Sequence, residues 1–241
     1  MNQYLTFDGV ASNTLGIILT KAPERPIPER KVDRVSVPGR NGDIIIEQDA
    51  WENVTLSYEI AYGGNVFGDY SEDTGVIAAW LHGSSGYRRL EDTFDADHYR
   101  LATVIRDHDT ESILARIGRA TLEFDADPRR FLKSGETEIT VASGDTLENP
   151  TVFTAKPRIE VLGTEDGAGT ITIGSKTISI NQIADGMVLD CEHEKATDTA
   201  GTLNYSLRVS GSYPVLAAGE QEITFTGDIT SLKIIPNWWE L

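Results

Sequence analysis

The residues best suited to chemistry are a cysteine and a histidine two positions apart, Cys191 and His193. On one extended strand this spacing places both side chains on the same face, where a thiolate and an imidazole can bind zinc. A structural zinc site needs four ligands, and no second pair stands at metal-binding spacing. We therefore expect a buried thiol beside a surface histidine, with no metal and no cofactor.

Two acidic clusters suggest other chemistry. Asp107-His108-Asp109 places an imidazole between two carboxylates, but nothing in the sequence marks a nucleophile or an oxyanion hole, so we interpret it as a polar turn. Asp92, Asp95 and Asp97 supply oxygen ligands without the glycine and the final glutamate of a calcium-binding EF-hand loop. Carboxylates are plentiful, yet no pair is singled out as that of a glycosidase. A hydrolase ranks last, and we predict no enzymatic activity.

Two short motifs resemble functional sites, but their expected positions in the fold argue against such a role. The glycine-rich stretch Gly163 to Gly169 joins two expected strands and opens no helix, so it lacks the geometry that cradles a phosphate. Asn53-Val54-Thr55 matches a glycosylation sequon, but we expect it in the middle of a strand. The N-terminal residues also lack the basic start and apolar stretch of a signal peptide.

Composition narrows the class of protein. The chain has 241 residues, 39% of them hydrophobic, which suffices for packed cores and argues against disorder. Residues 1–133 hold 15 basic and 22 acidic residues (net −7), and residues 134–241 hold 6 and 16 (net −10). Nucleic-acid binding normally needs a basic surface, so we expect neither DNA binding nor insertion into a membrane. The single cysteine permits no intrachain disulfide and fits synthesis in a reducing cytoplasm.

A polar stretch between Phe124 and Pro157 divides the chain into two halves. It contains Pro128, Gly135, Gly144 and Asn149-Pro150, which is typical of a linker between compact units. We predict two mainly β domains, residues 1–133 and 134–241. Protease cleavage would then occur first between residues 133 and 148.

The first half reads as strands with one helix. Alternating apolar residues predict a strand over 54–60, with shorter strands in 2–19, 101–105, 113–117 and 120–124. Ser71 to Leu81 is the one convincing helix, with Ser71 as its cap and Gly83 as its end. Ile77, Trp80 and Leu81 form one apolar stripe along it, which predicts that Trp80 belongs to the core.

A hairpin is predicted around residues 38–42. The segment 21–31 carries three prolines among charges and should be extended and exposed. Val35 and Val37 then lead into a turn, and Ile44 and Ile46 begin the return strand. Asn41-Gly42 is a strong hairpin signal because both residues tolerate positive φ.

The second half reads as a sandwich of short strands separated by turns. Strands are expected at 139–141, 152–153, 159–161, 171–173, 178–180, 187–191, 203–209, 223–225 and 232–234. The aromatic residues of this half fall mostly at apolar positions of the pattern, which favours the core over an exposed sugar platform. They are Phe153, Tyr205, Tyr213 and Phe225.

These features, in this order, resemble the distal tail proteins of long-tailed bacteriophages (siphoviruses). In the first half the resemblance rests on Phe7-Asp-Gly9, Val37-Pro-Gly-Arg-Asn-Gly-Asp43, Ala79-Trp-Leu81, Leu90, Tyr99 and Leu122 to Pro128. In the second half it rests on Asn149-Pro150, Pro157-Arg-Ile159, Val188-Leu-Asp190, Ser212 to Leu216 and Ile235 to Trp239.

The resemblance implies a fold and an assembly. It implies an N-terminal β-sandwich or split-barrel-like domain with one helix and a protruding hairpin, and a C-terminal galectin-like β-sandwich whose last strand can return toward the first domain. It also implies a hexameric ring of N-terminal domains at the end of the tail tube. In some members a long insertion in the C-terminal domain holds receptor-binding proteins, and this chain is too short to carry one.

The expected function is therefore structural: a virion protein, made in the host bacterial cytoplasm, that forms a ring hub joining the tail tube to the tail tip or baseplate. Its expected partners are itself, the tail tube protein, a tail-tip hub or fibre protein and the tape measure protein. The alternative is a carbohydrate-binding module that contributes to attachment to the host surface.

We predict that the hairpin contributes to the ring interface, because its exposed edges suit pairing with a neighbour. The candidate residues are Pro38, Gly39, Arg40, Asn41 and Gly42. A ring that passes DNA should present a neutral or acidic lumen, since each basic side chain adds phosphate attraction. The arginines expected at subunit contacts or outside the ring are Arg34, Arg40, Arg88, Arg89, Arg129 and Arg130.

Overall fold

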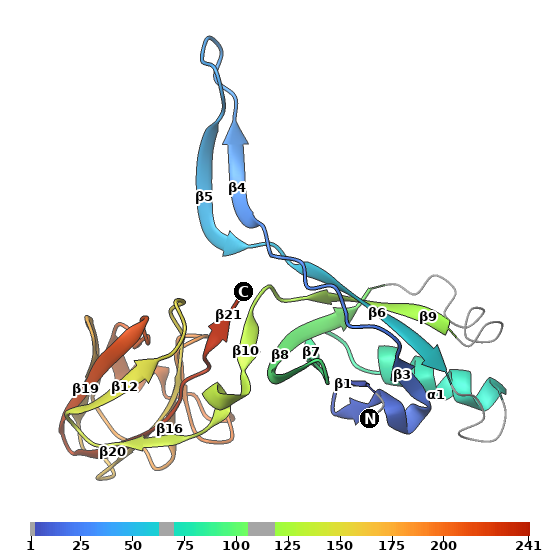
Figure 1. Ribbon diagram of the computed structural model, residues 1–241. Helices are drawn as coiled ribbons and strands as arrows, with labels where there is room; N and C mark the ends of the chain where they lie inside the picture. The colour runs from blue at the N-terminus through green and yellow to red at the C-terminus, as the bar shows by residue number, and fades with distance from the viewer. Residues whose placement is uncertain (1–2, 63–69, 106–118) are drawn as a thin grey trace. The chain divides into compact units, whose positions relative to one another are not determined.

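The protein consists of two compact units, residues 1–130 with Leu241 and residues 131–240, as seen in a computed structural model (Figure 1). The structure describes residues 3–62, 70–105 and 119–241. Strands dominate both units, which confirms the mainly β class. Among the described residues, no helix has the length and hydrophobicity needed to span a membrane.

The first unit is built on one antiparallel sheet in the order β2-β1-β7-β8-β9-β6-β3. Its longest strands are the ones whose apolar residues alternate most regularly. The strands are β1 (Leu5–Phe7), β2 (Val10–Ala11), β3 (Ile17–Leu19), β6 (Val54–Tyr62), β7 (Arg88–Asp92), β8 (Asp95–Val104) and β9 (Arg119–Ala126), with a 3-10 turn at Ser12–Leu15.

Aromatic residues fill the core of this unit. Every second residue of β6 is buried, as the sequence predicts, and Tyr58 and Phe124 from adjacent strands meet edge to face with ring centroids 5.8 Å apart. Phe7 of β1 completes the cluster at 5.1 Å from Phe124. The helix α1 (Tyr70–His82) buries Ile77 and Leu81 in the same core.

The helix confirms the predicted stripe with one change at its start. Trp80 packs near Phe7, and its indole Nε1–H donates a 3.0 Å hydrogen bond to the carbonyl of Phe7. At the other end, the N–H of Gly83 donates to the carbonyl of Ala79. Because the helix begins at Tyr70, Ser71 lies inside the helix and the prediction of Ser71 as the cap is wrong.

Strands β4 (Arg30–Val35) and β5 (Ile44–Trp51) form a separate two-stranded sheet and pair with each other (Figure 1). We call residues 30–51 the hairpin. Asn53 lies in the two-residue connection that follows β5, so its predicted position in the middle of a strand is wrong. The strand predicted over 113–117 lies outside the described residues.

The second unit is a sandwich of two five-stranded antiparallel sheets, in the orders β11-β20-β13-β16-β17 and β12-β19-β14-β15-β18. The first sheet contains β11 (Ile139–Val141), β13 (Arg158–Gly163), β16 (Met187–Asp190), β17 (Lys195–Thr197) and β20 (Ile229–Ile235). The second contains β12 (Asp145–Asn149), β14 (Gly169–Ile173), β15 (Lys176–Ile180), β18 (Val209–Gly211) and β19 (Gly219–Gly227). Two short strands, β10 (Arg130–Leu132) and β21 (Trp239–Glu240), pair with each other.

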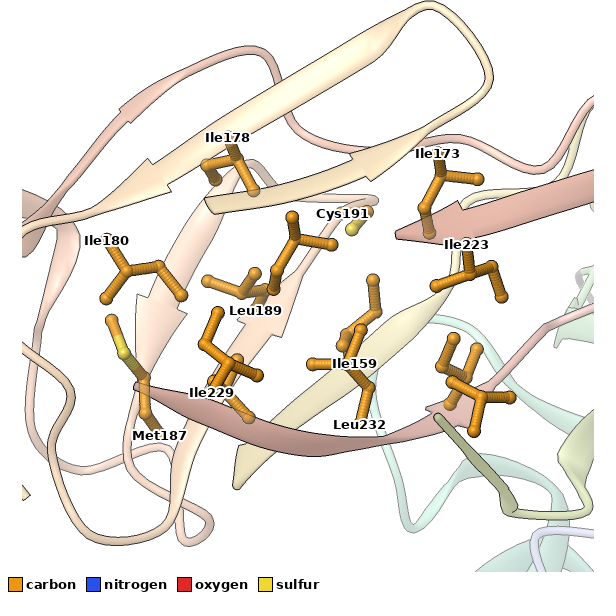
Figure 2. Packing of buried hydrophobic residues seen from close by; sticks show 14 of the residues in the cluster. Ile159, Ile173, Ile178, Ile180, Met187, Leu189, Cys191, Ile223, Ile229 and Leu232 are labelled. Carbon is orange, nitrogen blue, oxygen red and sulfur yellow. The ribbon is translucent and has the colours of Figure 1, made fainter. Parts of the chain in front are cut away.

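Aliphatic side chains from both sheets interlock to form the sandwich core (Figure 2). Ile159 and Leu189 come from one sheet, and Ile173 and Ile223 come from the other. The β14–β15 hairpin closes with two residues between Ile173 and Lys176, and Gly174 takes the positive φ (+55°) that the predicted glycine-led turn requires.

The polar stretch after residue 132 is not a linker. Residues 133–136 form a 3-10 turn, and β11 and β12 follow within the second sandwich. Gly135 is there for close packing, because a Cβ at this position would lie 2.4 Å from the backbone nitrogen of Trp238. Asn149 is buried, and its amide donates to the carbonyls of Phe153 and Leu216. The expected protease cleavage between residues 133 and 148 is therefore withdrawn.

Two strands predicted in this unit are wrong. Residues 152–153 form a bend, with Val152 exposed, because Asn149 and Thr151 fix the backbone there through side-chain hydrogen bonds. Residues 203–208 contain one isolated bridge and a 3-10 turn (Ser206–Arg208), and Leu207 is 99% exposed. The alternation of Leu203, Tyr205 and Leu207 therefore does not reflect burial on one face of a strand.

Candidate assembly surface

The hairpin is exposed to solvent along most of its length. Every residue from 33 to 49 is exposed, although the two strands keep regular antiparallel pairs from Val32–Glu47 to Val35–Ile44. A two-stranded ribbon is at best marginally stable when it stands alone in water. A ribbon of this length that is ordered and open to solvent is suited to packing against another surface.

At the tip of the hairpin the chain turns at Pro38-Gly39, ahead of the Asn41-Gly42 pair that signalled the hairpin in the sequence. The pair Val35–Ile44 closes an eight-residue loop, residues 36–43. Within it, the N–H of Arg40 donates a 3.1 Å hydrogen bond to the carbonyl of Val37, with Pro38 and Gly39 (φ +82°) as the central residues. Proline followed by a glycine at positive φ is the arrangement of a type II turn.

The hairpin predicted around residues 38–42 is therefore confirmed, and Pro38 and Gly39 form its turn. Gly42 has φ +78°, but Asn41 is not among the residues with positive φ. All five candidate residues, 38–42, are exposed in the loop at the end of the ribbon. Their role in an interface stays a prediction.

At the base of the hairpin, polar and charged side chains of the two strands interact with each other. Arg30 lies 3.1 Å from a carboxylate oxygen of Glu47, and its guanidinium also stacks 4.7 Å from the ring of Trp51. On the other face, the amide of Gln48 donates a 2.8 Å hydrogen bond to Asp33. These pairs hold the two strands together near the root.

The distal part of the hairpin is apolar instead. Val35, Val37 and three consecutive isoleucines, Ile44, Ile45 and Ile46, are all at least 37% exposed. Contiguous exposed apolar side chains are uncommon on proteins that stay single and mark contact surfaces. This patch, rather than the loop alone, is what the sequence analysis missed, although the Ile-Ile-Ile run was a visible signal.

An ionic network anchors the segment that leads into the hairpin. We call residues 21–29 the strap; it forms no strand, as predicted, although Pro28 is buried. The guanidinium of Arg25 lies 3.3 Å from Asp92 and 3.8 Å from Asp95. Asp92 also accepts a 3.0 Å hydrogen bond from the hydroxyl of the core residue Tyr58. The strap is thereby fixed to the sheet through partly buried carboxylates.

Asp95 is the centre of this network. Its carboxylate lies 2.6 Å from Nδ1 of His98 and 3.1 Å from the guanidinium of Arg130. Partial burial raises the pKa of Asp95, but the hydrogen bond from His98 and the nearby charges of His98, Arg25 and Arg130 outweigh it and lower the pKa below its usual value. Burial also lowers the pKa of the neighbouring Arg100 to about 10. Asp92, Asp95 and His98 lie close together in the sequence, but Arg25 and Arg130 join them only in the folded chain.

The lowered pKa of Asp95 makes a stability prediction. A depressed carboxylate pKa contributes stability above the unfolded value, about pH 3.9, and this contribution disappears as the pH falls through the folded value. Asp95→Asn should therefore cost about 1–3 kcal/mol at neutral pH, and the variant should lose less additional stability than the native chain below about pH 4. Urea unfolding measured at pH 7, 5 and 3 tests this, and parallel pH profiles would contradict it.

The cysteine and histidine pair forms no metal site. Strand β16 ends at Asp190, and Cys191, the next residue, is buried in the core. His193 is exposed, and its Nδ1 lies 2.8 Å from a carboxylate oxygen of Asp190. The possibility that both share one strand face is wrong, because the chain turns between them. Burial, with the charges of Asp190 and Glu194, raises the pKa of the Cys191 thiol to about 12.

Cys191 should consequently be inert in the folded protein. The thiolate is the reactive form of a cysteine, and a pKa near 12 keeps it scarce at pH 8. We expect a disulfide reagent such as DTNB to release less than a tenth of an equivalent from the native chain and one equivalent in denaturant. Rapid stoichiometric reaction of the native protein would show that this part of the sandwich opens.

Two of the other candidate sites lie within the described residues, and neither has the geometry of a binding site. Within the residues that the structure describes, no group of three or more potential metal ligands exists, so Asp92, Asp95 and Asp97 do not form a calcium site. The Gly163 to Gly169 loop joins β13 and β14, and the N–H of Ala168 donates to the side chain of Asp228 rather than facing an open site. Asp107-His108-Asp109 lies outside the described residues.

The six arginines named in the sequence analysis fall into two groups. Four lie against carboxylates of the first unit: Arg88 with Asp8, Arg89 with Glu91, Arg129 with Asp127 and Arg130 with Asp95. Arg34 and Arg40 are exposed on the hairpin and form no ion pair with any residue in the described ranges. The free basic charge of this set is therefore concentrated on the hairpin.

The aromatic residues of the second unit lie mostly against its core. Tyr205, Tyr213 and Phe225 pack against the buried cluster. Phe153 stacks on Trp239 with ring centroids 4.4 Å apart, and the indole Nε1–H of Trp239 donates to the carbonyl of Thr154. The stack covers one face of the Phe153 ring and one face of the Trp239 ring.

The described residues form a two-unit, mainly β architecture with one α-helix and an exposed hairpin, and solved structures resemble this fold. The Dit protein (gp 19.1) of phage SPP1, described as a paradigm of the hub adsorption apparatus in phages that infect Gram-positive bacteria, matches over 100% of both chains with a TM-score of 0.74 and 13% identity. Chains of the phage P2 baseplate in its activated conformation, with Ca and with Sr, match over 97% of both chains with TM-scores of 0.57 and identities of 9% and 8%.

No protein-family model and no curated protein matches the sequence. The similarity thus lies in the three-dimensional arrangement, which extends over the whole chain at very low identity. It confirms the fold expected from the resemblance to distal tail proteins.

Proposed function

We propose that this protein is a structural component of a bacteriophage tail, a hub that links the tail tube to the tail tip or baseplate. The observation that carries the proposal is the full-length structural match to the SPP1 hub protein, with a TM-score of 0.74. The described residues support it, because they form two packed cores and an exposed ribbon suited to contact with other chains.

The hub is a ring of six copies closed by contacts between first units. A contact between two different patches repeats around an axis and closes when the rotation permits it. The hairpin, including residues 38–42, supplies one of these patches, because its apolar side chains and unpaired strand edges are exposed. The tail tube protein, a tip or fibre protein and the tape measure protein are the remaining partners.

DNA leaves through the centre of this ring. A lumen that carries no unpaired basic side chains holds the phosphate backbone weakly. The ion pairs of Arg88, Arg129 and Arg130 support this, because those charges are already neutralised within the first unit. The net charge of −17 works in the same direction.

Native mass spectrometry of the purified chain over a range of concentrations tests the assembly, with a six-copy species as the expected result. Filter binding with a short DNA duplex at physiological salt should show no retention. A chain that binds duplex DNA tightly, or that binds saccharides on a glycan array and never assembles, would contradict the proposal.

A further inference from the structure

The pairing register of the hairpin gives its two faces different chemistry. Residues directly opposite each other in an antiparallel pair project to the same side, and neighbours along a strand project to opposite sides. Val35 pairs with Ile44 and Asp33 pairs with Ile46, so these four side chains share one face. Arg34 pairs with Ile45 and Val32 pairs with Glu47, so these four share the other.

We call the first the apolar face, after its cluster of Val35, Ile44 and Ile46. These side chains are 44%, 37% and 51% exposed, and they form one contiguous patch. The charges beside the patch already have partners: Asp33 accepts a 2.8 Å hydrogen bond from the amide of Gln48, and Lys31, two residues earlier on β4, lies 3.8 Å from Glu52. Nothing among the described residues covers the patch. Burying its apolar area against a partner would therefore be favourable through the hydrophobic effect.

The opposite, mixed face carries a single exposed isoleucine between charges. Ile45 is 60% exposed, with Arg34 directly across and Glu47 two residues along the same strand. Glu47 in turn pairs with Arg30 at 3.1 Å. Val32 also lies on this face but is only partly exposed. One exposed apolar side chain flanked by charges is ordinary on a protein surface and needs no partner.

The charge of the hairpin indicates the occupant of the apolar face. Between Arg34 and Ile46 the hairpin carries two arginines and one aspartate, a net charge of +1, whereas the whole chain has −17. Another copy of this chain therefore presents an acidic surface that complements Arg34 and Arg40. From root to tip the ribbon extends about 30 Å at about 3.3 Å per residue, which is enough to lie across a neighbouring unit.

We propose that the apolar face of the hairpin is buried against the first unit of a second copy of this chain, while the mixed face stays in solvent. The proposal rests on the ring assembly of the proposed function and adds which side of the ribbon makes the contact. Val35, Ile44 and Ile46 are the side chains that dock, and Arg34 and Arg40 approach the acidic surface beside them.

Two adjacent isoleucines provide a matched test. Ile46→Glu places a charge on the apolar face, and Ile45→Glu places the same charge one residue away on the mixed face. Both side chains are about half exposed in the single chain, so circular dichroism and thermal unfolding should be unchanged in both variants. In sedimentation velocity, we expect Ile46→Glu to weaken assembly at least tenfold and Ile45→Glu to change it less than twofold.

The outcomes separate this proposal from the proposed function. If both variants weaken assembly equally, or if Ile45→Glu weakens it more, the assignment of faces is overturned. The proposed ring assembly is not contradicted by that result. A photo-reactive benzophenone side chain at position 46 or 45, introduced in cells that assemble the particle, tests the occupant. A self-adduct from position 46 and little from 45 supports a second copy, whereas an adduct with a different protein overturns it.

Discussion

Replacing residues 34–45 by Asn-Gly is expected to convert the ring into single chains while leaving both units folded. Asp33 and Ile46 are opposite each other in the native register, so a two-residue turn joins them without changing the root of the hairpin. The change removes Val35, Ile44 and the loop 36–43. If these form the centre of the contact, the association constant should fall by about 100-fold or more.

Sedimentation velocity and thermal unfolding of the shortened chain make this measurable. The unfolding transitions should match those of the native chain, because the removed residues are exposed and contribute little to either core. A shortened chain that still assembles at native concentrations would place the ring contact elsewhere on the molecule.

The second large effect concerns the independence of the two units. Phe124 is fully buried between Phe7 and Tyr58 in the first core, and Leu189 is fully buried in the sandwich core. Phe124→Ala should cost about 3–5 kcal/mol, and Leu189→Ala should cost about 2–5 kcal/mol. Each variant should lower the stability of its own unit alone, because the two residues belong to separate clusters.

Differential scanning calorimetry distinguishes the two cases. We expect two transitions in the native chain, with Phe124→Ala lowering the temperature of one and Leu189→Ala that of the other. One shared transition that moves in both variants would show that the units unfold together and would count against two independent domains.

The parts of the fold that the sequence predicted are those governed by periodic burial. Val54, Leu56, Tyr58 and Ile60 alternate because one face of β6 is buried, and that pattern is visible without a structure. The helix was equally clear, because Ile77, Trp80 and Leu81 form one stripe. Such signals are local, and tertiary contacts reinforce them.

The errors arise where a residue type has more than one physical use. Gly135 suggested a linker, yet it is needed because the backbone of Trp238 approaches closely. Leu203 and Leu207 followed a strand period although neither is buried. Asn41-Gly42 was the residue pair that signalled the hairpin, but the hydrogen-bonded turn forms at Pro38-Gly39.

The candidate surface could be predicted only in part. The loop 38–42 was placed by its turn residues, whereas the apolar face depends on the register that pairs Val35 with Ile44. Register is a long-range property, and a shift by one residue would exchange the two faces. The strap network was invisible for the same reason, because Arg25 meets Asp92 and Asp95 only after the sheet has formed.

Electron microscopy of the assembled protein tests the central claim most directly. The account predicts a six-fold ring formed by the first units, in which each hairpin lies across the neighbouring copy with Ile44 and Ile46 buried and Ile45 facing solvent. A particle held together by the second units, with the hairpins extending freely into solvent, would contradict it.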